Sequence, residues 1–186
     1  MKGKFLIALT VLLSLCGCDA ESMFSSDYAC RFIFYTQYHP GTTIETALTG
    51  YGMYTMISAG KRSGVWHVYS TLNDGNDETE DITLTTAEEN YLDYSNLGAS
   101  NGIIVGLTNF SGIVAWDQHC SNCLRNYGGS SYPLSWTGNR QSVSCSKCGR
   151  TYSLETGAIT DGDEGISLFR YRVSYSGTGS VLTVTN

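Results

Sequence analysis

Two C-x-x-C pairs constrain this chain more than any other feature of its sequence. Cys120 and Cys123 form the first pair, Cys145 and Cys148 form the second, and 21 residues separate the two pairs. Two thiols three residues apart on a tight turn point at one centre, and a second such turn across a hairpin completes a tetrahedron of sulfur atoms. The spacing therefore predicts that these four cysteines are metal ligands. Two structural disulfides, or thiols without a ligand, are the alternatives, because disulfides persist outside the cytosol.

The N-terminus has the composition of an export signal. Lys2 and Lys4 precede an unbroken apolar run over residues 5–13, which is shorter than the roughly 20 residues that a membrane-spanning helix needs. The run is followed by Leu-Cys-Gly-Cys at 15–18, which resembles a bacterial lipoprotein signal with Cys18 as the lipidated residue. Acyl chains on Cys18 would hold the protein at a membrane surface.

This resemblance implies a division of the chain. We expect a signal peptide at 1–17, a lipidated cysteine with a flexible tether at 18–29, and one folded domain at 30–186. The protein is then exported and lipid-anchored on the periplasmic or cell-surface side of a bacterial membrane. Two prolines in 186 residues also argue against a Pro-rich linker and a second domain.

The charge of the chain excludes some partners. Without Lys2 and Lys4, the chain has nine basic and 17 acidic residues. Nucleic acid and an anionic bilayer both require a basic face, so the overall balance argues against either as a direct binding partner. Five carboxylates within 73–81 match no calcium-binding loop, and we expect the acidic loop at 74–81 to be a solvated hairpin tip.

The pattern along the chain predicts an all-β domain. Short alternating or β-branched segments recur with Gly-rich turns between them, as in β-sandwiches and barrels. We expect strands at 30–38, 50–58, 65–72, 102–109, 113–118, 133–137, 140–144, 150–154, 167–175 and 180–185. One short helix is predicted at 87–94, because Thr86 and Glu89 have the spacing of a capping box, and Gly98 is placed to end it. We expect His39, in the turn 39–41, to be solvated.

The region around the cysteines resembles a Rieske domain, and more narrowly the Rieske-like lipoproteins of Bacteroides-type bacteria. The second pair continues as Cys-Gly-Arg-Thr-Tyr-Ser-Leu-Glu-Thr-Gly over 148–157, which is similar to the family's C-x-x-H-G motif with its following aromatic residue and T-G. The resemblance covers about 102–186. It implies a Rieske-like sandwich with a small rubredoxin- or zinc-ribbon-like metal-binding subdomain at 116–165.

The ligands depart from the Rieske pattern. A Rieske [2Fe–2S] centre uses two histidines and two cysteines, whereas Cys148 and Asn122 occupy the positions where histidine is expected here. Two C-x-x-C turns match a four-cysteine zinc site directly. Lys2 and Lys4 also provide no twin-arginine signal for exporting a folded iron–sulfur protein. Zinc is therefore the preferred occupant, and a [2Fe–2S] cluster or no metal are the alternatives.

Four residues beside the ligands are candidates for a supporting shell: His119, Lys147, Gly149 and Arg150. Nearby cations favour thiolate over thiol, and glycine after the second pair is typical of a zinc knuckle. No catalytic set stands out among three histidines. The sequence therefore predicts a non-enzymatic structural or binding module. The alternative function is a single-electron carrier, with a redox partner protein and a [2Fe–2S] cluster on the same cysteines.

Overall fold

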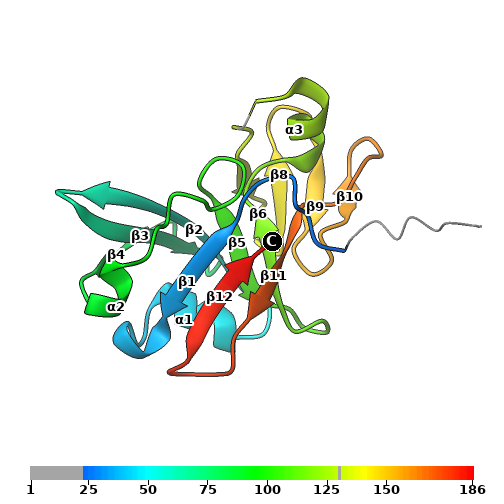
Figure 1. Ribbon diagram of the computed structural model, residues 1–186. Helices are drawn as coiled ribbons and strands as arrows, with labels where there is room; N and C mark the ends of the chain where they lie inside the picture. Colours follow the sequence, from blue (N-terminus) through cyan, green and yellow to red (C-terminus); the bar gives the residue numbers. More distant parts are fainter. Residues whose placement is uncertain (1–22, 130) are drawn as a thin grey trace, which may run out of the picture.

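The computed structural model describes residues 23–129 and 131–186, so the expected signal peptide and Cys18 lie outside the described residues. Figure 1 shows a mostly β domain built from one large curled sheet and one small sheet. The predicted all-β class is confirmed. In the described part of the chain, no helix is long and apolar enough to cross a membrane.

The large sheet has eight antiparallel strands in the order β1-β12-β11-β6-β5-β2-β3-β4. These strands are β1 (Arg31–Tyr35), β2 (Met53–Arg62), β3 (Val65–Leu72), β4 (Glu80–Leu84), β5 (Ile103–Leu107), β6 (Ile113–Asp117), β11 (Arg170–Ser174) and β12 (Val181–Thr185). Strand β11 changes its partner strand along its length. Arg170 and Tyr171 pair with β6, whereas residues 172–174 pair with β12.

The small sheet has the order β10-β9-β8-β7 and contains β7 (Leu134–Trp136), β8 (Ser142–Cys145), β9 (Thr151–Ser153) and β10 (Ile159–Asp161). Its four strands follow the chain order as an antiparallel meander. All four strands lie within the 116–165 segment that the sequence assigns to the cysteine subdomain. The small sheet therefore carries the second cysteine pair.

The described residues contain three α-helices and one 3₁₀ turn: α1 (Thr43–Thr49), α2 (Ala87–Asn90), α3 (Ser121–Tyr127) and η1 (Thr36–Tyr38). The capping box of Thr86 and Glu89 is present, but α2 ends at Asn90, well before Gly98. The sequence predicted neither α1 nor α3. The sequence signal for α1 was present, because Thr42 and Glu45 have the same spacing as Thr86 and Glu89. The Thr42 side chain accepts a hydrogen bond from the Glu45 N–H, as Thr86 does from Glu89.

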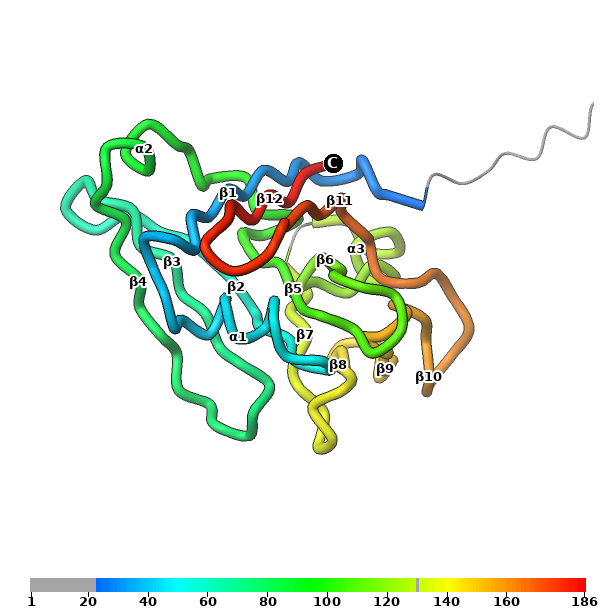
Figure 2. The backbone as a smooth tube through the Cα atoms, turned by 90° about the horizontal axis from the view of Figure 1, so that it is seen from below, coloured from blue at the N-terminus to red at the C-terminus, as the bar shows by residue number. Residues whose placement is uncertain are grey.

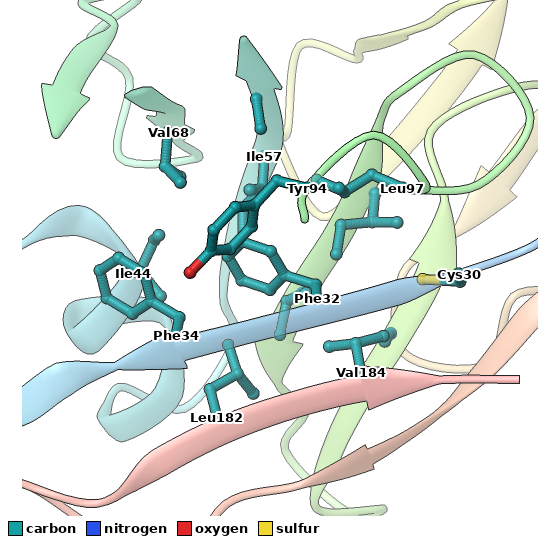
Figure 3. Close-up of a cluster of buried hydrophobic side chains, with 14 of the residues drawn as sticks. Cys30, Phe32, Phe34, Ile44, Ile57, Val68, Tyr94, Leu97, Leu182 and Val184 are labelled. Carbon is teal, nitrogen blue, oxygen red and sulfur yellow. The ribbon is translucent and has the colours of Figure 1, made fainter. Parts of the chain in front are cut away.

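Two separate hydrophobic clusters stabilise the domain. In the first, Figure 3 shows Phe32 and Phe34 of β1, with Leu182 of β12, near Ile57 and Tyr94. The second cluster lies between the two sheets and consists of Tyr54, Ile104, Val114, Trp116, Cys120, Cys123, Leu134, Val143, Cys145, Tyr152, Leu154 and Leu168. Three of the four predicted ligands therefore belong to a hydrophobic core.

His39 corrects one expectation. Its side chain is 13% exposed, its Nε2 lies 2.6 Å from the Glu89 Oε1, and its ring stacks on Phe34. Glu89 is fully buried and also accepts a hydrogen bond from the Thr86 N–H. A buried carboxylate needs partners, and His39 supplies one from a turn 50 residues earlier in the chain. His39 is therefore part of the packing and is not solvated.

Candidate metal centre

The four cysteines of the two C-x-x-C pairs meet at one point. All four sulfur atoms lie within 4.8 Å of one another. The Cys120 and Cys148 sulfurs are 3.7 Å apart, as are those of Cys123 and Cys145. Cys120, Cys123 and Cys145 are buried, whereas Cys148 is partly exposed. The cluster therefore has a buried interior and one side open to solvent at Cys148.

The first pair is placed by the end of β6 and the start of α3. Cys120 is the N-cap residue of α3, and Cys123 lies in its first turn. The Cys120 N–H donates to the Tyr132 carbonyl oxygen at 2.9 Å, which ties this junction to the segment that leads into β7. A helix start orients its first side chains more rigidly than a free turn, so the two sulfurs have a firm support.

The second pair lies on the turn between β8 and β9. Cys145 ends β8, and its N–H donates to the Arg150 carbonyl oxygen at 2.9 Å across the turn. Gly149 has a φ of +74°, and its N–H donates to the Cys145 carbonyl oxygen at 2.8 Å. Few residues other than glycine adopt this backbone conformation without strain, so Gly149 closes the turn that returns the chain to β9.

A tyrosine and an asparagine contact the buried side of the cluster. The Tyr152 phenol oxygen lies 3.1 Å from the Cys120 sulfur, and the Asn122 amide donates to that oxygen at 2.8 Å. Asn122 also donates to the Ile166 carbonyl oxygen and accepts from the Ile166 N–H. Neither residue was predicted from the sequence as a support. Asn122 lies inside the first C-x-x-C, which was the available signal, whereas Tyr152 looked like an ordinary strand residue.

The surroundings treat the four thiols differently. Burial raises the pKa of Cys120 and of Cys123. Burial also acts to raise the pKa of Cys148, but hydrogen bonds from the backbone and side chain of Arg150 outweigh it and lower this pKa to about 7. Burial and the hydrogen bond to Cys120 raise the pKa of Tyr152. The Cys148 thiol therefore has a lower pKa than the Cys120 and Cys123 thiols.

The remaining candidates for a supporting shell lie in different places. Lys147 lies over the Tyr127 ring, with 5.2 Å between Nζ and the ring centroid. The His119 N–H donates to the Asp117 carboxylate at 2.7 Å, and the His119 Nδ1 is 3.3 Å from the same oxygen without hydrogen-bond geometry. Arg150 contacts Cys148, and its guanidinium donates to the Asp163 and Glu164 carbonyl oxygens.

The sulfur spacing tests which occupant fits. Zn–S bonds of ~2.3 Å in a tetrahedron require sulfur atoms about 3.8 Å apart, close to the two separations of 3.7 Å. A [2Fe–2S] cluster places two irons and two bridging sulfides between its pairs of ligands, so thiolates on different irons must lie farther apart than thiolates on one iron. A disulfide needs about 2.05 Å. The 3.7 Å separations exclude disulfides and fit two thiolates on one tetrahedral ion, zinc or iron, so the four cysteines could hold a metal ion.

The acidic loop lies away from the cysteines. Asp77 accepts a hydrogen bond of 2.8 Å from Arg140, and Glu80 accepts one of 2.7 Å from the Thr43 N–H. Asp77 and Arg140 line the edge of a groove of about 670 Å³ between β2, β3 and β7. Most of the loop is exposed, but these two contacts tie it to the rest of the domain.

Comparisons with known proteins add little beyond this geometry. No family model matches the chain, and no curated protein matches it. A solved structure described as a nitrite reductase NADPH (small subunit) oxidoreductase protein is 16% identical, over 46% of this chain and 76% of its own length, with a TM-score of 0.28. A TM-score at that level supports no argument about this chain, so the site is interpreted from its own residues.

Proposed function

We propose that this chain is an exported, lipid-anchored protein whose four paired cysteines hold one zinc ion, and that the ion stabilises a structural or binding module. The observation that supports zinc is the compact sulfur cage, whose members all lie within 4.8 Å of one another. Cys120, Cys123, Cys145 and Cys148 would be the ligands. Zinc bound by four thiolates has no open position for water, so its contribution is to stability and not to hydrolysis.

The position of the cage in the core explains how an ion would stabilise the fold. Cys120 and Cys123 come from the junction after β6, whereas Cys145 and Cys148 come from the small sheet. An ion bound by all four joins these two parts of the chain across the second hydrophobic cluster. Because the small sheet has strands of only three or four residues, we expect this region to depend strongly on that joint.

Supporting contacts also agree with a thiolate site. The Tyr152 hydroxyl and the Arg150 N–H can both donate hydrogen bonds to sulfur. Donors of this kind stabilise ligating thiolates and orient them. Lipid anchoring rests on the apolar run at 5–13 and on Cys18, which belong to the undescribed part of the chain.

Metal analysis of the purified protein tests this proposal. Residues 19–186, which lack Cys18, are expected to be colourless and to contain about one zinc per chain. Cobalt substitution should produce the intense thiolate absorption of a tetrahedral site. Cys145→Ser should lose most of the metal, whereas Cys30→Ala, which removes a buried cysteine outside the cage, should keep it. Two irons per chain with a reducible visible spectrum, or no metal with thiols that titrate only after reduction, would contradict the zinc site.

The second candidate is a single-electron carrier with a [2Fe–2S] cluster on the same cysteines. The partial exposure of Cys148 favours it, because electrons need a short path from a cluster to a partner protein. Four cysteine ligands would give such a cluster a low potential, similar to plant-type ferredoxins. Two C-x-x-C turns match a four-cysteine zinc site directly, so this function ranks second.

A further inference from the structure

The first described residues are fixed to one end of the domain. The Ser25 N–H donates to the Arg170 carbonyl oxygen at 2.8 Å. The Asn186 side chain donates to the carbonyl oxygens of Ser25 and Tyr28 at 2.8 and 2.9 Å. Figures 1 and 2 both show the blue start of the described chain on the side of α3 and β10, opposite α2. The chain therefore leaves the domain at a defined place.

The chain between the proposed anchor and this place is short. Four residues separate Cys18 from Met23. Even fully extended, five steps of ~3.4 Å reach only about 17 Å. A domain of this size is about 40 Å across, which is more than twice that reach. An anchor at Cys18 therefore keeps the end near Met23 close to the bilayer and prevents the opposite end from facing it.

The end of the domain near Met23 and the opposite end at α2 differ in their charged residues. Beside the first described residues lie Arg125, which pairs with Asp27, and Arg170 and Arg172, which lie over the Phe24 ring. Asp27 and, near β10, Asp161 and Glu164 also belong to this side, so it is close to neutral. The segment around α2, which Figure 2 shows opposite this end, carries the exposed acids Glu88 and Asp93. An anionic surface would repel that side more strongly.

The end near Met23 also exposes side chains that suit a headgroup region. Met23 is 68% exposed and Tyr127 is 61% exposed. The guanidiniums of Arg170 and Arg172 lie over the Phe24 ring, 5.6 and 4.9 Å from its centroid. Tyrosine and arginine combine an apolar body with a polar tip, which favours the boundary between lipid and water.

We propose that the surface formed by residues 23–28, the last turn of α3, and Arg170 and Arg172 faces the headgroups of an anionic bilayer, while the acidic side of α2 points away. This inference rests on the proposed lipid anchor. The overall acidic charge of the chain does not exclude this contact, because the anchored end is close to neutral. Since Cys123 lies on α3, the candidate metal centre is held on the membrane side of the domain.

Photo-crosslinking from two exposed tyrosines tests this orientation. The chain 18–186 is joined through its N-terminal cysteine to a lipid thioester in vesicles of phosphatidylethanolamine and phosphatidylglycerol. Benzoylphenylalanine replaces either Tyr127 on α3 or Tyr91 beside α2, which is 91% exposed. We expect at least fivefold more lipid adducts from position 127. Equal yields, a higher yield from position 91, or no adducts at either position would overturn the orientation.

Two controls separate the orientation from the anchor. Exposed Arg172→Glu combined with Arg125→Glu should lower the yield at position 127 in these vesicles but not in phosphatidylcholine vesicles, whereas Lys61→Glu with Arg62→Glu on the distant hairpin should not. Unchanged yields in the first variant would remove the charge argument. Palmitate labelling of the full chain tests Cys18 independently: without a label, the proposed anchor is wrong, while the adduct ratio still reports the orientation.

Discussion

The phenol oxygen of Tyr152 lies 3.1 Å from the Cys120 sulfur and receives a hydrogen bond of 2.8 Å from the Asn122 amide. The tyrosine is fully buried, so its hydroxyl has no bulk water as an alternative partner. With Asn122 as donor, the phenol is left to donate its own proton to sulfur. β9, the strand that follows the second cysteine pair, thus supports a ligand that comes from the first pair.

We expect Tyr152→Phe to keep the fold and to weaken metal binding. Loss of a hydrogen bond to a ligand typically costs 10–100-fold in metal affinity, and the lower part of that range, about tenfold, applies to one neutral donor. Competition with a chromophoric chelator measures the change. Tyr132→Phe is the matched control, because its hydroxyl donates to the Gly128 carbonyl oxygen away from the sulfurs. Equal affinities of the two variants would deny Tyr152 this role.

Asp117 should be one of the most sensitive residues of the fold. Its fully buried carboxylate accepts from the Tyr171 hydroxyl at 2.7 Å, the Ala99 N–H at 2.8 Å and the His119 N–H at 2.7 Å. Asp117→Ala leaves three buried donors without an acceptor, so we expect a loss of about 3–5 kcal/mol in the free energy of unfolding. Tyr171→Phe removes one donor and should cost about 1–2 kcal/mol. Urea denaturation compares them, and similar losses would show that the shared acceptor is unimportant.

Alanine substitutions at Gly157 and Gly149, beside the cysteine cluster, distinguish the cost of backbone strain from the cost of a steric clash. Both have a φ of +74°, so replacement by alanine strains both to a similar degree, about 1 kcal/mol. A Cβ at Gly157 would lie 2.7 Å from the Trp116 ring, whereas a Cβ at Gly149 meets nothing within 4 Å. Gly157→Ala should therefore cost a further 1–3 kcal/mol. Thermal and urea unfolding measure the difference, and equal stabilities would contradict the packing seen at Trp116.

Glu155 should make stability depend on pH. Burial acts to raise the pKa of Glu155, but the backbone N–H groups of Asn109 and Phe110 donate to its carboxylate and hold this pKa below its usual value of 4.5. A lowered folded pKa stabilises the fold above about pH 4.5, and the contribution is lost as the pH falls through the folded value. Glu155→Gln should thus cost about 1 kcal/mol at pH 7 and nearly nothing at pH 3.

Urea denaturation of both proteins at the two pH values tests this, because the difference between them removes the contribution of the cysteines. A difference that stays constant with pH would mean that the carboxylate charge has no part in holding the turn between β5 and β6.

The sequence alone was sufficient to predict the all-β class of the fold and the meeting of the four cysteines at one point. Strands were predictable because alternation is a local property. The hairpin of β2 and β3 turns at Ser63 and Gly64, both with positive φ, between the predicted strands 50–58 and 65–72. The Thr86–Glu89 cap was predictable for the same reason, since both partners lie within four residues.

Contacts between distant segments were decided only by the tertiary structure. Alternation does not say which distant strands are neighbours, so the change of partner at β11 from β6 to β12 and the pairing of β1 with β12 could not be predicted. Tyr152 looked like any strand residue until folding brought it against Cys120, 32 positions earlier. His39 became a partly buried partner of Glu89 because a carboxyl group removed from water requires a hydrogen-bond partner, wherever the chain can supply one.

The cysteine spacing determined that four sulfurs could meet, because a C-x-x-C turn directs both of its thiols to one side. The distances among them depend on how α3 and the turn after β8 pack across a shared core, which no local pattern encodes. That packing brought all four sulfurs within 4.8 Å of one another, where they could hold a metal ion.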